Sequence, residues 1–152
     1  MRLLSVAAEV AVPLGENMVD VWGGGHYHPE AFDNELNTKF IEDHKKLYDK
    51  EPGYAASEAD SAIYALKYAI EKANSFEVEA VIKALEGLEF ESVTGKRYIR
   101  PRDHQAIRAQ LFSHFVPTSE SPGWKIVEHA KIASEDVYPS EDEEQYRCTR
   151  IK

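Results

Sequence analysis

The chain has 152 residues, of which 43% are hydrophobic, so it has room for one domain with a hydrophobic core. It carries 18 basic and 27 acidic residues, a formal net charge of −9, whereas nucleic-acid binders present a basic surface. No apolar run approaches the roughly 20 residues that a spanning helix needs. The composition therefore excludes a membrane-embedded protein and argues against a nucleic-acid binder.

The N-terminal segment is apolar, but Glu9 interrupts it. A secretory signal peptide has an uncharged stretch of about 7–15 residues that leads to a small-residue cleavage site. We therefore expect no signal peptide in this chain, and expect the apolar segment to belong to the fold.

A short strand is predicted around Val21 and Trp22, ending at the glycines 23–25. Successive glycines indicate a turn or a close approach by another group, because glycine has no Cβ. Three helices are predicted next. Apolar residues three and four apart mark a first helix over 36–48, capped by Asp33 or Asn34.

The second predicted helix runs from about Ser57, which begins a capping-box-like arrangement, to Ala73. Its apolar face comprises Ala59, Ala62, Ile63, Leu66, Ala69 and Ile70. The third helix follows Ser75 as its N-cap, and Gly87 ends it.

After Gly87 the apolar period changes to that of strands. A hairpin is predicted over 88–99 with Gly95 in its turn, followed by strands over 106–116 and 124–132 around a Ser121-Pro122-Gly123 turn. The fold class is therefore mixed α/β, with three helices followed by a hairpin and two strands.

The acidic excess is concentrated at the C-terminus, where six acids and no base lie between Ser134 and Gln145. We divide the chain into a domain over 1–133 and a solvated acidic tail over 134–152. The single cysteine, Cys148, lies in that tail and cannot form an intrachain disulfide.

Two histidines flank Tyr27, and His26 and His28 share one face if the segment is extended. A metal site would need a third ligand, and the nearest candidates, Glu30 and Asp33, are reached only through a turn. We predict no metal ligand and no cofactor. Tyr27, which follows the glycines, instead suits the lining of a small-molecule cleft, with packing in its own domain as the alternative.

Asp103-His104 has two members of a catalytic triad, but no activated nucleophile accompanies it. A turn in which Asp103 accepts backbone hydrogen bonds explains these residues better. Five bases near the hairpin are interpreted as charge balance against Glu86, Glu89 and Glu91, with an anion contact as the alternative: Lys96, Arg97, Arg100, Arg102 and Arg108. We predict that the chain is not an enzyme.

Four segments, taken in order, resemble type I periplasmic binding proteins of branched-chain amino acid ABC transporters. They are Asn37-Thr38-Lys39-Phe40 with Tyr48 and Glu51-Pro52; the helix from Ala62 to Ala73; Val81 to Phe90, which is similar to the pattern V-x-x-A-L-E-G-x-x-F; and Gly95, Arg100 and Asp103-His104-Gln105. The resemblance spans about Gly15 to Ile132. The chain departs from the family at Asp60, where an aromatic is usual near the start of the second helix, and in its length, which is less than half that of family members.

The resemblance implies the C-terminal part of a two-lobed fold, and thus a fragment of a substrate-binding component of an ABC uptake transporter for amino acids or related small carboxylates. A ligand-sensing regulatory domain on the same scaffold is the alternative. The implied partners are a small-molecule solute, an ABC permease and a second copy in a homodimer, and the implied location is periplasmic or extracellular.

The resemblance also implies which residues lie at the edge of the ligand cleft: Tyr27, Tyr54, Ala55 and Ser57. Because a half-cleft cannot exclude water from a ligand, we expect the isolated chain to bind weakly or not at all.

Overall fold

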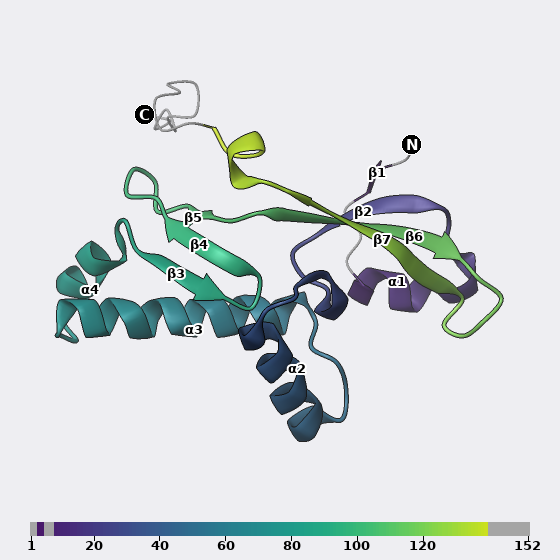
Figure 1. Cartoon of the computed structure of the whole chain (residues 1–152), viewed down its shortest axis with the longest axis horizontal. Coiled ribbons are helices and arrows are strands. Elements are labelled where there is room, and N and C mark those ends of the chain that lie inside the picture. The colour runs from purple at the N-terminus through teal and green to yellow at the C-terminus, as the bar shows by residue number, and fades with distance from the viewer. Residues whose placement is uncertain (1–2, 5–7, 140–152) are drawn as a thin grey trace, which may run out of the picture.

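The computed structural model describes residues 3–4 and 8–139 (Figure 1). Its helices are α1 (Ala8–Leu14), α2 (Glu35–Tyr48), α3 (Tyr54–Ala73) and α4 (Val78–Leu85). Its strands are β1 (Leu3–Leu4), β2 (Val21–Gly25), β3 (Glu89–Ser92), β4 (Gly95–Ile99), β5 (Ala106–Ile107), β6 (Gln110–Pro117) and β7 (Trp124–Ile132). The predicted class and the order of three helices, a hairpin and two strands are confirmed, and α1 is an additional helix.

The strands form two separate sheets. One has the order β1-β2-β6-β7, in which β1 pairs parallel to β2 and the other pairs are antiparallel; the other is the antiparallel sheet β3-β4-β5. We call the first sheet with α1 the sheet body, and the second with α3 and α4 the helical body. The chain crosses between them twice, through residues 26–34 with α2, and through Arg108-Ala109 (Figure 1).

The first predicted helix begins close to where it was expected, whereas the third begins at Val78 and has Glu77 rather than the predicted Ser75 as its N-cap residue. Asn34 caps α2 by accepting a hydrogen bond from the Asn37 backbone N–H at 2.9 Å. The second helix, α3, begins three residues before the predicted start, because Gly53 rather than Ser57 is its N-cap residue. Ser57 lies inside the helix, where its hydroxyl donates to the Tyr54 carbonyl at 2.9 Å.

The face of α3 that the helical body buries matches the predicted apolar face only at its C-terminal end, where Ala69 is buried and Ile70 packs against the core. The buried stripe consists of small residues, which let the helix lie close to its neighbours: Ser57, Ser61, Ala65 and Ala69. Ile63 and Leu66, from the predicted apolar face, are 67% and 44% exposed. An apolar stripe of α3 therefore faces solvent.

The glycines at 23–25 are part of β2 and do not form a turn. Gly24 lies opposite Phe112 of β6, and a Cβ on Gly24 would lie 3.2 Å from the Phe112 ring. The expectation of a close approach is thus confirmed at Gly24. The predicted strand 106–116 is broken at Arg108-Ala109, since β5 and β6 belong to different sheets.

Three clusters of buried apolar residues hold the fold together. One lies in the helical body, around Ala69, Val81 and Phe90, and a second in the sheet body, around Val21 and Phe115. The third joins the two bodies, because Val93 from the hairpin and Leu111 from β6 pack with residues of the first crossing: Tyr27, Ala31 and Phe32.

Of the predicted acidic tail, Ser134–Asp136 form a 3₁₀ turn, while residues 140–152, including Cys148, lie outside the described residues. None of the helices in the described part of the chain combines the length and apolar character needed to cross a membrane.

Candidate functional site

The four predicted cleft residues differ in how accessible they are. Tyr54 is 41% exposed in the first turn of α3, and Ala55 beside it is also exposed. Ser57 is fully buried. Tyr27 is 4% exposed, but it borders a cavity that Ala55 also lines.

Tyr27 is held by its own domain. Its hydroxyl donates to Oδ1 of Asn37 at 2.7 Å, and its ring stacks on Phe32 with centroids 6.0 Å apart. Burial raises the pKa of Tyr27 well above its ordinary value, and Glu51 and Asp60 add to this shift, so the phenol stays protonated and acts as a donor. Tyr27 therefore stabilises the first crossing, and little of its side chain is accessible to a ligand.

A cluster of buried charges lies beside Tyr54, where the two bodies meet. Glu58, one turn further along α3, accepts two hydrogen bonds from Arg97 of β4, at 2.8 and 3.0 Å. Arg97 also donates to Ser92 and Thr94, at 3.1 and 2.9 Å, and is 4% exposed. The guanidinium of Arg97 is thus hydrogen-bonded through all three of its nitrogens, as a buried charge must be if it is not to destabilise the fold, while Glu58 is part-exposed.

Arg108, in the second crossing, is the less firmly held guanidinium of the cluster. It is 6% exposed, its Nη1 donates to the Ala109 carbonyl at 3.1 Å, and its Nε lies 3.9 Å from Glu58, beyond hydrogen-bond distance. A guanidinium has five N–H donors, so Arg108 retains capacity for a further acceptor.

His26, the first residue after β2, completes the cluster. Its ring meets that of Tyr54 edge-on with centroids 6.0 Å apart, and its Nδ1 lies 3.9 Å from Glu58. Burial lowers the pKa of His26, as do Arg108 and Arg97, while Glu58 opposes the shift. His26 is therefore neutral at neutral pH.

The charge of the cluster follows from its carboxylate. Burial tends to raise the pKa of Glu58, but hydrogen bonds and charge from Arg97, with the charge of Arg108, outweigh burial and lower it. Glu58 is ionised, and two guanidiniums share it. The edge formed by Tyr54, His26 and Arg108 thus has an excess of positive charge.

Two cavities lie near this edge. The larger, of about 500 Å³, is open to solvent and is lined by residues of α1, the first crossing, the α2–α3 connection and β7, among them Tyr27, Ala55 and Trp124. Its size falls in the range of small-molecule sites, roughly 300–1,000 Å³. Nε1 of Trp124 is buried and has no hydrogen-bond partner among the described residues.

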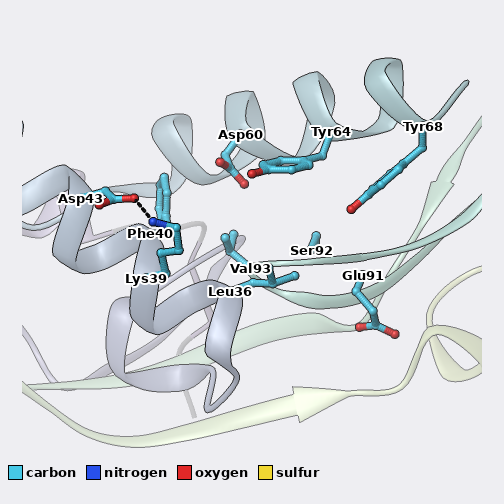
Figure 2. A pocket seen from close by; sticks show the side chains of 10 residues that line it. All are labelled: Leu36, Lys39, Phe40, Asp43, Asp60, Tyr64, Tyr68, Glu91, Ser92 and Val93. Carbon is cyan, nitrogen blue, oxygen red and sulfur yellow. Dashed lines mark hydrogen bonds and ion pairs between the residues drawn. The ribbon is translucent and has the colours of Figure 1, made fainter. Parts of the chain in front are cut away.

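The second cavity, of about 150 Å³, lies between α2, α3 and β3 (Figure 2). Figure 2 shows the rings of Tyr64 and Tyr68 reaching from α3 toward β3, with Asp60 on the same helix. Lys39 on its wall is paired with Asp43 at 2.8 Å. Because the wall also carries Asp60 and Glu91, carboxylates outnumber amines there. A small acidic hollow suits a carboxylate solute less well than the first cavity does.

The structure explains Asp103-His104 as a turn, as predicted. Asp103 accepts two hydrogen bonds from Arg100, at 2.9 and 2.7 Å, and one from the Gln105 backbone N–H at 3.2 Å. His104 points to Glu86 instead, at 3.1 Å. The two side chains diverge, so they do not form a catalytic pair.

Four of the five bases near the hairpin divide into two groups, and the fifth, Arg102, lies 3.6 Å from the Asp103 carboxylate. Lys96 pairs with Glu89 on the surface, as the charge-balance interpretation expected. Arg97, Arg100 and Arg108 are buried, and their carboxylate partners are Glu58 and Asp103. The surface-pair explanation is wrong for these three, because their guanidiniums are buried. The hairpin turns Arg97 toward Glu58 of α3, whereas Arg100 and Arg108 follow the hairpin and lie against Asp103 and near Glu58.

Sequence reasoning did not identify Glu58, and it considered His26 only as a metal ligand. One signal was available: in the predicted hairpin, Arg97 lies opposite the apolar Phe90, with which it pairs in register. An arginine on an inward face requires a buried acid, and α3 supplies Glu58.

The structure is that of a mixed α/β protein in which two sheet-containing bodies are joined by two crossings, with a charged edge and an open cavity near their junction. The chain belongs to the periplasmic binding protein family, whose profile matches residues 1–116. The resemblance seen in the sequence is thereby confirmed. Among curated proteins, none matches the chain significantly.

Solved structures of this kind resemble the chain. A branched-chain amino acid ABC transporter protein from Rhodopseudomonas palustris matches with a TM-score of 0.72 at 24% identity, over 85% of this chain and 35% of its own. A leucine-binding protein from Thermotoga maritima matches with a TM-score of 0.67 at 26% identity, over the same shares.

A third similar structure is a solute-binding protein of an ABC transporter from R. palustris in complex with 3,4-dihydroxybenzoic acid. Its TM-score is 0.65 at 20% identity, over 80% of this chain and 34% of its own. The chain therefore spans about a third of the length of the structures it matches. These relatives are solute-binding proteins.

Proposed function

We propose that the chain is part of the substrate-binding component of an ABC uptake transporter for amino acids or related small carboxylates. The observation that carries the proposal is the excess of positive charge at the edge formed by Tyr54, His26 and Arg108. A solute carboxylate there would accept hydrogen bonds from Arg108, whose donors are not all used.

The four predicted residues take two roles in this proposal. Tyr54 and Ala55 contact the solute, because their side chains are exposed at the start of α3. Ser57 and Tyr27 position those contacts from beneath, Ser57 through its bond to the Tyr54 carbonyl and Tyr27 through Asn37. For an amino acid, the part-exposed carboxylate of Glu58 suits the ammonium group.

A titration followed by backbone amide NMR signals tests the site. We expect leucine and 3,4-dihydroxybenzoate to shift the signals of residues 26, 54–58 and 108 saturably, with dissociation constants in the millimolar range, about 4 kcal/mol of binding. Leucinamide, which lacks the carboxylate, should not. Equal shifts with leucine and leucinamide would contradict carboxylate recognition, and a submicromolar calorimetric affinity would contradict weak binding.

A matched pair of variants separates the site from general effects. Tyr54→Ala should abolish the shifts, whereas Tyr48→Ala, an exposed tyrosine at the end of α2, should leave them unchanged. If both variants behave alike, Tyr54 is not a contact residue.

The partners proposed are an ABC permease and a second copy of the chain, and the proposed location is periplasmic or extracellular. The exposed stripe of α3 that includes Ile63 and Leu66 supports self-association, because apolar patches of this kind tend to become covered. Light scattering should give a dimer mass for the chain and a monomer mass for Ile63→Ser/Leu66→Ser. A monomer mass for the unaltered chain would contradict the homodimer.

A further inference from the structure

A group of metal-ligating side chains lies apart from the charged edge, where the first crossing passes over β7. His28 and Glu30 come from the crossing and His129 from β7, and each offers one ligand atom within 4.8 Å of the others. The rings of His28 and His129 have their centroids 5.0 Å apart. The group combines two imidazole nitrogens with one carboxylate oxygen.

His129 is held in the orientation that a metal ligand needs. Ser113 lies opposite it in the β6–β7 register, and the Ser113 hydroxyl is hydrogen-bonded to Nδ1 of His129 at 2.9 Å. Metal-ligating histidines usually have their second ring nitrogen held in this way.

The other nitrogen of His129, Nε2, is buried and has no hydrogen-bond partner among the described residues. A buried nitrogen without a partner destabilises a fold, and a metal ion would satisfy it. When Nδ1 carries the proton, the lone pair on Nε2 is available to the ion.

The first crossing brings the other two ligands together by a turn. Pro29–Ala31 form a 3₁₀ turn that His28 caps, with Nδ1 accepting the Glu30 N–H at 3.4 Å. At 3.4 Å this contact is at the long end of the hydrogen-bond range, and the ring of His28 offers one nitrogen to the group. The turn places Glu30 beside His28, the arrangement that the sequence allowed only through a turn, whereas the sequence did not reveal His129 as the third residue.

The geometry requires a small closing movement. Ligand atoms around a tetrahedral zinc ion lie about 3.3 Å apart, for bonds of about 2.0–2.1 Å. Glu30 is exposed and His28 part-exposed, so both side chains have room to close from 4.8 Å. Lys131 is the nearby cation, and its amine lies over the Phe32 ring at 5.3 Å.

We propose that His28, Glu30 and His129 bind a divalent transition-metal ion of the zinc class and so fasten the first crossing to β7. Two imidazoles and one carboxylate suit zinc, cobalt, nickel or copper rather than calcium or magnesium. Three protein ligands leave a further coordination position for water.

The test is a titration of the full chain, freed of metal by a chelator, with Co²⁺ followed by visible absorption and with Zn²⁺ followed by calorimetry. We expect one equivalent to bind, with Co²⁺ bands typical of a low-coordinate site, and Zn²⁺ but not Mg²⁺ to raise the melting temperature. Absence of Zn²⁺ binding would overturn the proposal.

Variants identify the ligands. His129→Ala and His28→Ala should each weaken Zn²⁺ binding by well over tenfold, and Ser113→Ala by about tenfold, through loss of the bond to Nδ1. His28 lies in a surface turn, so His28→Ala keeps the test decisive if His129→Ala fails to fold by circular dichroism. His104→Ala, at an exposed histidine that belongs to neither site, is the matched control and should bind as the unaltered chain does. If His28→Ala binds zinc normally, or if only Cys148→Ser loses binding, the assignment is wrong.

Discussion

The helical body and the sheet body differ in how completely they satisfy their own buried polar groups. In the helical body, the buried guanidinium of Arg97 is matched to Glu58, Ser92 and Thr94. In the described part of the chain, the two buried side-chain nitrogens without a partner, Trp124 Nε1 and His129 Nε2, both lie on β7 of the sheet body. A strand that leaves buried nitrogens unpaired marks where a ligand, an ion or another part of a protein adds contacts.

The two bodies also differ in how much of each sheet is covered by helices. In the helical body, α3 and α4 pack against each other and against the hairpin. In the described part of the chain, the sheet body has one helix, the short α1. None of the residues of its strand β7 is fully buried. The stability of the sheet body should therefore depend heavily on a few core residues.

The largest expected effect comes from Phe115, which is 1% exposed in the core of the sheet body. Phe115→Ala should reduce the free energy of unfolding by about 4 kcal/mol, because it leaves a large cavity that the strands cannot fill. Urea denaturation measures the loss. Val127→Ala on β7, where Val127 is 52% exposed, is the control and should cost less than about 0.5 kcal/mol. Similar losses for both would mean that this core does not hold the sheet body together.

The next effect tests the matched charges of the helical body. Arg97→Met should destabilise by about 3 kcal/mol, because Glu58 and the hydroxyls of Ser92 and Thr94 lose their partner. Lys96→Met, at the adjacent exposed position, should change stability by less than about 1 kcal/mol, as surface pairs do. Equal effects would show that burial does not distinguish the two cations.

The smallest effect concerns Asp103, whose carboxylate is 38% exposed. Hydrogen bonds from Arg100 lower the pKa of Asp103 to about 2, against burial. Because the folded-state pKa lies below the unfolded value of about 3.9, the stabilisation is present above pH 4 and is lost as the pH falls toward 2. Because the carboxylate is partly exposed to solvent, this stabilisation amounts to less than about 1 kcal/mol.

The measurement is a series of urea titrations between pH 5 and pH 2. Asp103→Asn should flatten the loss of stability that the unaltered chain shows between about pH 4 and pH 2. An unchanged acid dependence in that variant would mean that Asp103 contributes nothing to it.

Sequence periodicity predicted the elements well, because helix and strand periods depend on local residues. The predicted limits of β7 are the observed ones, and Asn34 caps α2 as one of two expected residues. The periodicity misassigned most of the buried face of α3, with Ala69 and Ile70 the exceptions, since which stripe is covered depends on neighbours that are distant in sequence. Small residues such as Ser61 and Ala65 make the contact, although Ile63 and Leu66 are more apolar.

The candidate sites were harder to predict from the sequence, again because they depend on contacts between residues that are distant along the chain. Glu58 and Arg97 are 39 residues apart, and Glu30 and His129 meet only because the first crossing folds over β7. Family resemblance located Tyr54 near the first turn of α3, whereas the charged residues beside it could be identified only from the structure.

The second crossing consists of just Arg108 and Ala109, between strands that belong to different sheets. So short a connection permits little separation of the two bodies at this point. The residue proposed to hold a solute's negative charge therefore lies in the shortest covalent link between them.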